Sequence, residues 1–76
     1  MNVTNTPAET ISVVVNGEWR EVPPEHSVAT LLDWLNIASD RVAVELNKEL
    51  VRKRDWSNAS VTRGARIEIV EFVGGG

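Results

Sequence analysis

Cysteine is absent from this 76-residue sequence, and histidine occurs once, as His26. Without cysteine the chain can form no disulfide and has no thiolate nucleophile. A single histidine cannot supply the ligand set of a zinc site, so we expect no metal centre. His26 has no carboxylate or nucleophile at a matching spacing in the sequence, and we expect no acid–base catalysis from it.

Basic residues are outnumbered, and long apolar runs are missing. Eight Lys and Arg residues against eleven Asp and Glu residues give a net charge of −3. This balance argues against nucleic acid as a partner and favours a partner protein with a basic surface. No apolar run approaches the ~20 residues of a membrane span, and the first residues lack the basic-then-apolar pattern of a signal peptide. We therefore expect a soluble, cytoplasmic protein with no membrane partner.

The length of the chain limits what it can build. A chain of 76 residues forms one domain, which buries only about 60% of its unfolded surface. The hydrophobic content of 42% excludes a wholly disordered chain. One sheet with a single helix against it fits this size, whereas a deep catalytic cleft does not. We therefore expect a protein that is not an enzyme.

After a polar, aperiodic leader at residues 1–10, residues 11–22 have the pattern of a β-hairpin. Apolar residues alternate at Ile11, Val13 and Val15 and are followed by Asn16-Gly17. Asn-Gly is a strong hairpin signal because a type I′ turn needs positive φ at both central residues. The return strand runs from Glu18 to Val22 and stops at Pro23-Pro24, which cannot donate to a ladder.

One short helix is expected after the hairpin. Ser27 is a plausible N-cap, since its hydroxyl can accept from an orphan amide of the first turn. Apolar residues then recur at the i, i+3, i+4, i+7 spacing of one helix face, at Val28, Leu31, Leu32 and Leu35. The helix should have one buried side and end near Asn36.

The second half of the chain indicates three more strands. Residues 42–46 alternate, 47–49 form a turn, and Leu50-Val51 is a short strand. A tight turn at 55–57 is expected to place the side chain of Trp56 against the core. After a turn at 63–66, Ile67 and Ile69 lie on one face of a final strand. Without the short strand at 50–51, the order is ββαββ, an α+β mixed sheet with one main helix packed on one face. With the last strand buried beside the first, this is the β-grasp topology of ubiquitin-like proteins.

The outer face of this sheet is a candidate partner surface. Hairpin register places Val14 opposite Trp19, facing away from the core, and alternation places Val70 and Phe72 on the same side. We expect these four residues to form an apolar patch with an acidic rim of Glu45, Glu68 and Glu71. The alternatives are that Trp19 only covers its own sheet and that the acidic rim only confers solubility.

The sequence ends in three glycines, Gly74, Gly75 and Gly76. Residues 11–73 are expected to form the domain and 74–76 an extended tail. A backbone without side chains can enter a channel too narrow for any Cβ, which leaves the terminal carboxylate open to a reagent. A flexible terminus without function is the alternative.

Several segments between Ile11 and Gly76 together resemble the ThiS family of sulfur carrier proteins of thiamine biosynthesis. They are Val-Asn-Gly-Glu at 15–18, Ala-Val-Glu-Leu-Asn at 43–47, Trp56, Ile-Glu-Ile-Val at 67–70 and Val-Gly-Gly-Gly at 73–76. Loops differ from the family pattern at Lys48, Arg52-Lys53 and Gly64-Ala65. We expect these differences to affect the choice of partner more than the chemistry.

The resemblance implies a co-substrate that binds no cofactor of its own. A ThiF-like adenylating enzyme would use ATP to adenylate the carboxylate of Gly76, and a sulfur-donating enzyme would supply sulfur derived from cysteine. The resulting thiocarboxylate would give its sulfur to the thiazole ring at a ThiG-like thiazole synthase. Three other functions remain open: a sulfur carrier for molybdopterin or another sulfur-containing metabolite, a ubiquitin-like protein modifier, and a β-grasp interaction module.

Overall fold

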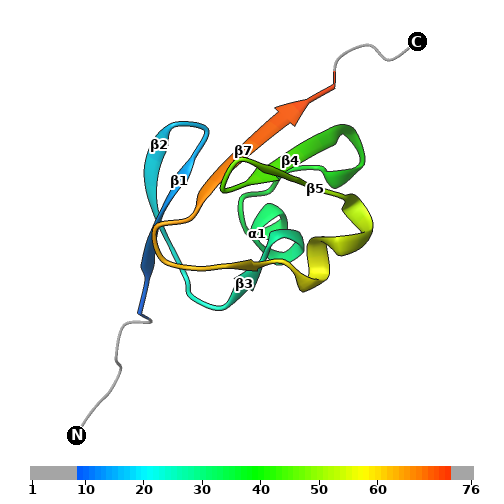
Figure 1. Cartoon of the computed structure of the whole chain (residues 1–76). Helices are drawn as coiled ribbons and strands as arrows, with labels where there is room; N and C mark the ends of the chain where they lie inside the picture. Colours follow the sequence, from blue (N-terminus) through cyan, green and yellow to red (C-terminus); the bar gives the residue numbers. More distant parts are fainter. Residues whose placement is uncertain (1–8, 73–76) are drawn as a thin grey trace, which may run out of the picture.

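The computed structural model describes residues 9–72, which form two sheets, one α-helix and two 3-10 helices (Figure 1). The leader residues 1–8, Val73 and the three glycines lie outside the described residues. In chain order the elements are β1 (Ile11–Val15), β2 (Glu18–Val22), β3 (His26–Ser27), α1 (Val28–Trp34), η1 (Ser39–Arg41), β4 (Val42–Leu46), β5 (Glu49–Val51), η2 (Lys53–Asn58), β6 (Ser60–Val61) and β7 (Arg66–Glu71).

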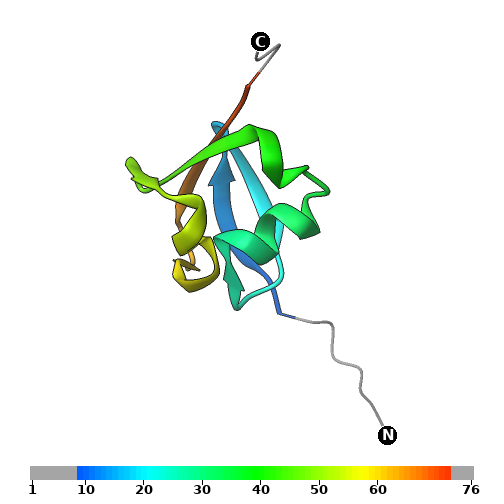
Figure 2. The same ribbon diagram turned by 90° about the vertical axis from the view of Figure 1, so that its right-hand side faces the viewer.

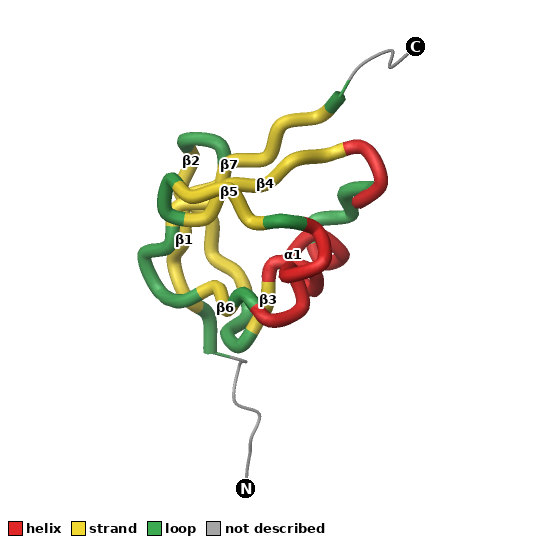
Figure 3. Tube along the Cα trace, turned by 45° about the vertical axis from the view of Figure 1, so that its right-hand side comes forward, coloured by secondary structure: helices red, strands yellow, loops and turns green. Residues whose placement is uncertain are grey.

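The larger sheet has five strands in the order β2-β1-β7-β4-β5. Strand β7 lies in the middle, parallel to β1 and antiparallel to β4. Figure 3 shows the helices gathered to one side of the strands. The α+β class, the mixed sheet and the β-grasp topology are therefore confirmed.

The first hairpin has the expected turn and register. Asn16 and Gly17 have φ of 51° and 85°, as a type I′ turn requires. Val15 pairs with Glu18, and Val14 pairs with Trp19. The second hairpin uses the same device at Asn47 and Lys48, with φ of 53° and 73°, so β5 begins at Glu49 rather than Leu50.

Helix α1 is short and capped at both ends. The Ser27 hydroxyl accepts from the Thr30 amide, and the Thr30 hydroxyl accepts from the Ser27 amide, which completes a capping box. At the other end Asn36 has a φ of 62°. Its amide donates to Asp33 and that of Ile37 to Leu32, the two bonds of a Schellman motif. These caps fix a seven-residue helix across one face of the sheet (Figure 2).

The core lies between α1 and the sheet. It contains the predicted apolar faces of the strands and the helix, including Val13, Val44, Leu32 and Ile67, each no more than 1% exposed. Trp56 is buried on η2, and its indole N–H donates to the Val51 carbonyl at 2.9 Å. Ile69 is partly buried against the same cluster. The side chains expected in the core are thus found there.

A second, two-stranded sheet was not expected from the sequence. Strand β3 pairs with β6 through His26–Val61 and Ser27–Ser60. Each strand has only two residues, which is too few to show an alternating pattern. This small sheet ties the start of α1 to the segment that leads into β7.

Candidate functional site

The end of β7 is the candidate site, because the three glycines of the predicted tail follow it in the sequence at residues 74–76. On one side of β7, the Phe72 amide donates to the Arg41 carbonyl at 2.8 Å. On the other side, the Ile69 amide donates to the side-chain Oδ1 of Asn16 at 2.7 Å. The chain therefore leaves the sheet in a defined direction at Phe72. The predicted tail residues Gly74, Gly75 and Gly76 lie outside the described residues.

The two turn asparagines hold β7 from opposite sides. Asn16 Oδ1 accepts from Ile69, and Asn47 Oδ1 accepts from the Arg66 amide at 2.9 Å. Both asparagines have positive φ, a conformation that asparagine tolerates better than most residues. One residue type thus provides both the turn and the hydrogen bond to the central strand. These turns could be predicted from the sequence, but their contacts with β7 could not.

Three of the four residues of the expected apolar patch are exposed. Trp19, Val70 and Phe72 are 69%, 58% and 54% exposed. Val14 is only 6% exposed, so its expected place in an accessible patch is wrong. Val14 does lie on the outer face, but β1 is an interior strand, and Val14 has Trp19 and Arg66 directly opposite it in the two neighbouring strands.

The expected patch is also divided. Arg66 is the β7 residue beside Val14, whereas Val70 comes four residues later and pairs with Ala43. At ~3.3 Å per residue, this separation along the strand is about 13 Å. Trp19 and the Val70–Phe72 end of β7 are therefore two separate exposed sites, with Glu68 between Arg66 and Val70.

The acidic rim is only partly as expected. Glu68 lies on the outer face and is paired with Glu45. Glu71 pairs with Val42, a core residue, so it belongs to the opposite face of the sheet and its place in the rim is wrong. The reason is the period of two, which returns Glu71 to the side of Ile67 and Ile69.

Leu50 is an exposed outer-face residue that was not among the predicted surface residues. It is 67% exposed and pairs with Glu45. The turn at Asn47 would have shown this, because a two-residue hairpin loop fixes the pairing of the residues on either side. Leu50, Glu45 and Glu68 thus form one row across three strands.

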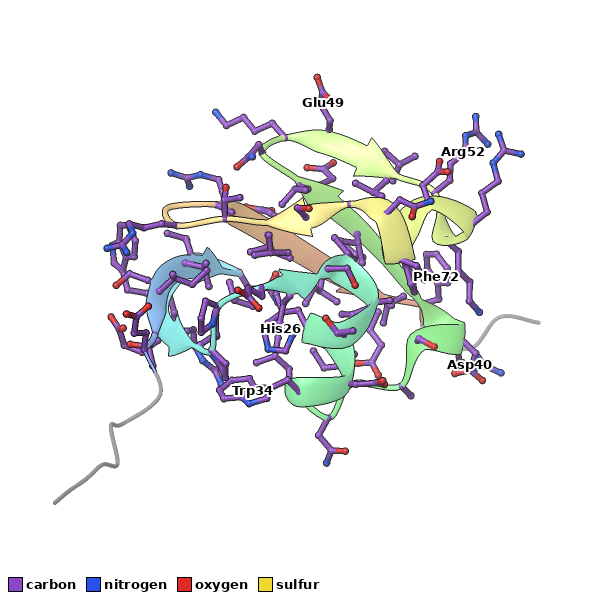
Figure 4. All side chains as sticks on the ribbon, turned by 90° about the horizontal axis from the view of Figure 1, so that it is seen from below. His26, Trp34, Asp40, Glu49, Arg52 and Phe72 are labelled. Carbon is purple, nitrogen blue, oxygen red and sulfur yellow. The ribbon has the colours of Figure 1, made fainter. Side chains whose placement is uncertain are left out.

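The rest of the described surface has fewer candidate functional groups. A hollow of about 550 Å³ near the start of α1 is lined by residues that include His26, Ser60 and Arg63. His26 Nδ1 lies 2.8 Å from the Thr30 hydroxyl, and Figure 4 shows His26 and Trp34 near α1, away from Phe72. Within residues 9–72, no three His, Asp or Glu side chains are grouped to hold a metal ion. Over the same residues, no helix is long and apolar enough to cross a membrane.

Comparison with known proteins supports the interpretation of this topology. The sequence profile of the ThiS family matches residues 13–76, from the middle of β1 through the last glycine. The chain belongs to the ThiS family. The crystal structure of the thiamine biosynthesis protein ThiS from Geobacter metallireducens superimposes with a TM-score of 0.77 at 32% identity, covering 87% of this chain and 100% of that one.

Two sequence relatives differ in how much of their own length corresponds to this ThiS-family chain. A thiazole synthase of Paramagnetospirillum magneticum is 41% identical over 66 residues, which are 87% of this chain but 20% of that protein. The uncharacterized protein ycf40 of Porphyra purpurea is 33% identical over 66 residues, 93% of its length. The chain thus spans about a fifth of one relative and nearly all of the other.

Proposed function

We propose that this chain is a sulfur carrier protein of thiamine biosynthesis and that its reactive group is the carboxylate of Gly76. Membership of the ThiS family over residues 13–76 carries the proposal. The structure supports it by showing a central strand, paired with β1 and β4, that ends at Glu71, close before the three glycines in the sequence. The carrier is a co-substrate and not an enzyme.

The proposed chemistry needs little from the carrier itself. A carboxylate is a poor electrophile until its oxygen becomes part of a good leaving group. A ThiF-like adenylating enzyme would join the Gly76 carboxylate to the AMP portion of ATP and release pyrophosphate. A sulfur-donating enzyme would then deliver sulfur, at the oxidation level of sulfide, to the Gly76 carbonyl carbon, with loss of AMP, to give the thiocarboxylate. Glycine at 74–76 leaves the carbonyl carbon unhindered and the backbone thin enough for a narrow channel.

The proposed acceptor enzyme is a ThiG-like thiazole synthase. Two proteins named thiazole synthase, from Paramagnetospirillum magneticum and Magnetococcus marinus, contain a segment that is 41% and 32% identical to this chain. In each of them this segment is about a fifth of the whole protein. A carrier-like segment and a synthase joined in one polypeptide are consistent with a reaction that they share.

The proposed docking surface is the outer face of the sheet beside the tail. It comprises Glu68, Val70 and Phe72, which lie on or just after β7 and are exposed. Any enzyme that takes the tail must approach the end of β7 and so meets these side chains. Trp19 and Val14 lie at the other side of this face, and Glu71 lies on the opposite face. We assign these three no direct part in docking.

ATP–pyrophosphate exchange with the ThiF-like enzyme of the same organism tests the proposal. Four forms are compared: wild type, Gly75→Ala, deletion of Gly76, and one extra residue after Gly76. All four should have the same melting temperature, and only wild type should support fast exchange, because the others displace or hinder the reactive carbon. Equal exchange by the extended or shortened form would show that the terminal carboxylate is not the reactive group.

The product distinguishes this function from its alternatives. Protein isolated from its native host should show the mass increase of one oxygen replaced by sulfur at the C-terminus. Thiazole formation with the synthase would assign the pathway. A branched peptide joining Gly76 to a lysine would instead indicate a protein modifier.

A further inference from the structure

Strand β7 has a free edge after Ile69. The Asn16 amide donates to the Ile67 carbonyl, so the odd-numbered residues of β7 turn their main-chain N–H and C=O groups toward β1. Strand β1 ends at Val15, and beyond it Asn16 Oδ1 accepts only from the Ile69 amide. Within residues 9–72, the C=O of Ile69 and the N–H and C=O of Glu71 therefore have no hydrogen-bond partner.

The two edge strands of the larger sheet are protected against pairing, whereas this free edge is not. Strand β2 has charged side chains at three of its five positions and is followed by Pro23, and β5 has only three residues. Charges, proline and short length all discourage the addition of another strand. The free edge of β7 has one charged residue, Glu71, between the partly buried Ile69 and the exposed Phe72, with Val70 also exposed. It is thus the edge of this sheet that is most open to a further strand.

There is room beside this edge, next to the tip of the first hairpin. Within the described part of the chain, a Cβ added to Gly17 would meet no atom within 4 Å beyond its chain neighbours. A hollow of about 280 Å³ lies on the helix side of the tip and is lined by Val15, Asn16, Glu18, Arg20, Leu35 and Ile37. Asn16 lines this hollow and also contacts Ile69, so the hollow adjoins the free edge. Leu35 and Ile37 are partly buried and give it an apolar side.

An extended peptide complements such an edge. The acceptor of Ile69 and the donor and acceptor of Glu71 lie on one side of the strand, two residues apart, as in any strand that faces a neighbour. A strand added there would continue the line of β1, and its side chains would alternate between the two faces of the sheet. A side chain on the helix face would meet Leu35 and Ile37, and the next one, on the outer face, would meet Val70. A segment with an apolar side chain on each face therefore fits.

We propose that the free edge of β7 receives an extended segment of the ThiF-like adenylating enzyme, added to the sheet as a strand beside Ile69 and Glu71. This inference rests on the proposed function. The adenylating enzyme is chosen because attack of the Gly76 carboxylate on the α-phosphorus of ATP requires a fixed position of that carboxylate. The edge lies on the same strand as Val70 and Phe72 of the proposed docking surface, so one approach serves both contacts. The Glu71 side chain lies on the other face, and only the main chain of this residue takes part.

Proline at position 71 removes the N–H that faces the free edge. The β4 ladder uses the even-numbered residues of β7, so Glu71→Pro should lower the melting temperature by no more than about 4 °C. In pyrophosphate exchange it should raise the KM for the carrier about 10-fold or more. Glu71→Ala keeps the N–H and reports the loss of the side chain alone, and its KM should be at least 5-fold below that of Glu71→Pro. Leu50→Pro is the matched control at another edge, because Leu50 lies in β5 opposite Glu45, in a pair whose main-chain groups face outward, and it should keep the wild-type KM.

Hydrogen exchange on the wild-type chain tests the same contact without a substitution. The full-length carrier is mixed with the ThiF-like enzyme of its own organism in the absence of ATP. The Glu71 amide should exchange at least 10-fold more slowly in the complex than in the free chain, whereas the Leu50 amide should be unaffected. NMR cross-saturation from the enzyme should reach the methyl groups of Leu35 and Ile37.

The opposite results would overturn this assignment. Equal exchange of the Glu71 amide in the free and bound chain, or equal KM for Glu71→Pro and Glu71→Ala, would show that no strand is added at this edge. A Glu71 amide that is protected in the free chain and loses protection on dilution would make a second copy the occupant. Protection that appears only with the thiazole synthase would assign the edge to that enzyme instead. In each case pyrophosphate exchange by wild type leaves the sulfur carrier function standing, and its absence would refute that function as well.

Discussion

Replacing Asn16 separates the two roles that this residue combines. Its backbone supplies the positive φ of 51° in the first hairpin, and its Oδ1 accepts from the Ile69 amide at 2.7 Å. Asn16→Gly keeps the turn and removes the hydrogen bond. Asn16→Asp keeps an acceptor oxygen and a residue that tolerates the left-handed region. Asn16→Ala removes both features.

The expected costs follow from these roles. Asn16→Gly loses one hydrogen bond to the central strand, worth about 1 kcal/mol. Asn16→Ala adds the cost of a left-handed alanine, about 1–2 kcal/mol, for a total of roughly 2–3 kcal/mol. Asn16→Asp should stay within about 0.5 kcal/mol of wild type. For a domain of this size, 1 kcal/mol corresponds to a shift of about 4–8 °C in melting temperature.

Urea unfolding gives the free energy for each variant, and hydrogen exchange at the Ile69 amide reports the bond itself. Exchange at Ile69 should be faster in Asn16→Gly than in Asn16→Asp. The amides in the middle of β1 should exchange at the same rate in these two variants. If Gly and Asp variants are equally stable and protect Ile69 equally, the side chain of Asn16 does not hold β7.

Three further predictions concern the core, the tail end and the hairpin. Leu32→Ala should cost roughly 2–5 kcal/mol of unfolding free energy, since the side chain is fully buried; an unchanged melting temperature would contradict the assigned helix face. Phe72→Ala should leave stability nearly unchanged, because Phe72 is 54% exposed, but should raise the Kd for the adenylating enzyme; loss of folding would instead place Phe72 in the core. Hydrogen bonds from Ser12 and Thr10 lower the pKa of Glu21 below its ordinary value of 4.5. The Glu21 carboxylate therefore stabilises the fold fully at a pH above its ordinary pKa, and this stabilisation is lost as the pH falls through the folded-state pKa. NMR titration of Glu21 should show the low pKa, and Ser12→Ala should raise it.

Local patterns were sufficient for most of the fold. Asn16-Gly17 fixed both the turn type and the pairing of Val14 with Trp19, because each depends on neighbouring residues alone. The spacing of Val28, Leu31 and Leu32 identified the buried face of the helix for the same reason. The middle position of β7 came from its apolar composition and from the topology that a single crossover helix allows.

Properties that depend on distant pairing could not be predicted from the sequence. Alternation placed Val14 on the outer face, but its burial depends on which strands flank β1. The division of the apolar patch depends on the register between β1 and β7, and Val14 meets Arg66 rather than Val70. No local pattern sets this register, since the two strands are joined through the rest of the domain. The facing of Glu45 and Glu68 became visible only in the structure for the same reason.

The way in which β7 is held explains how a small domain could present the proposed reactive end. On the hairpin side, the last hydrogen bond to β7 within residues 9–72 is the one from Ile69 to Asn16. On the β4 side the ladder continues to the bond between Phe72 and Arg41. From Val70 onward the strand is therefore supported along one edge only, which leaves its other edge and its outer face open to a partner. A strand fixed at Ile69 and supported at Phe72 gives the chain a direction without enclosing it. An enzyme can then bind the exposed side chains of β7 and the residues that follow them in a single approach.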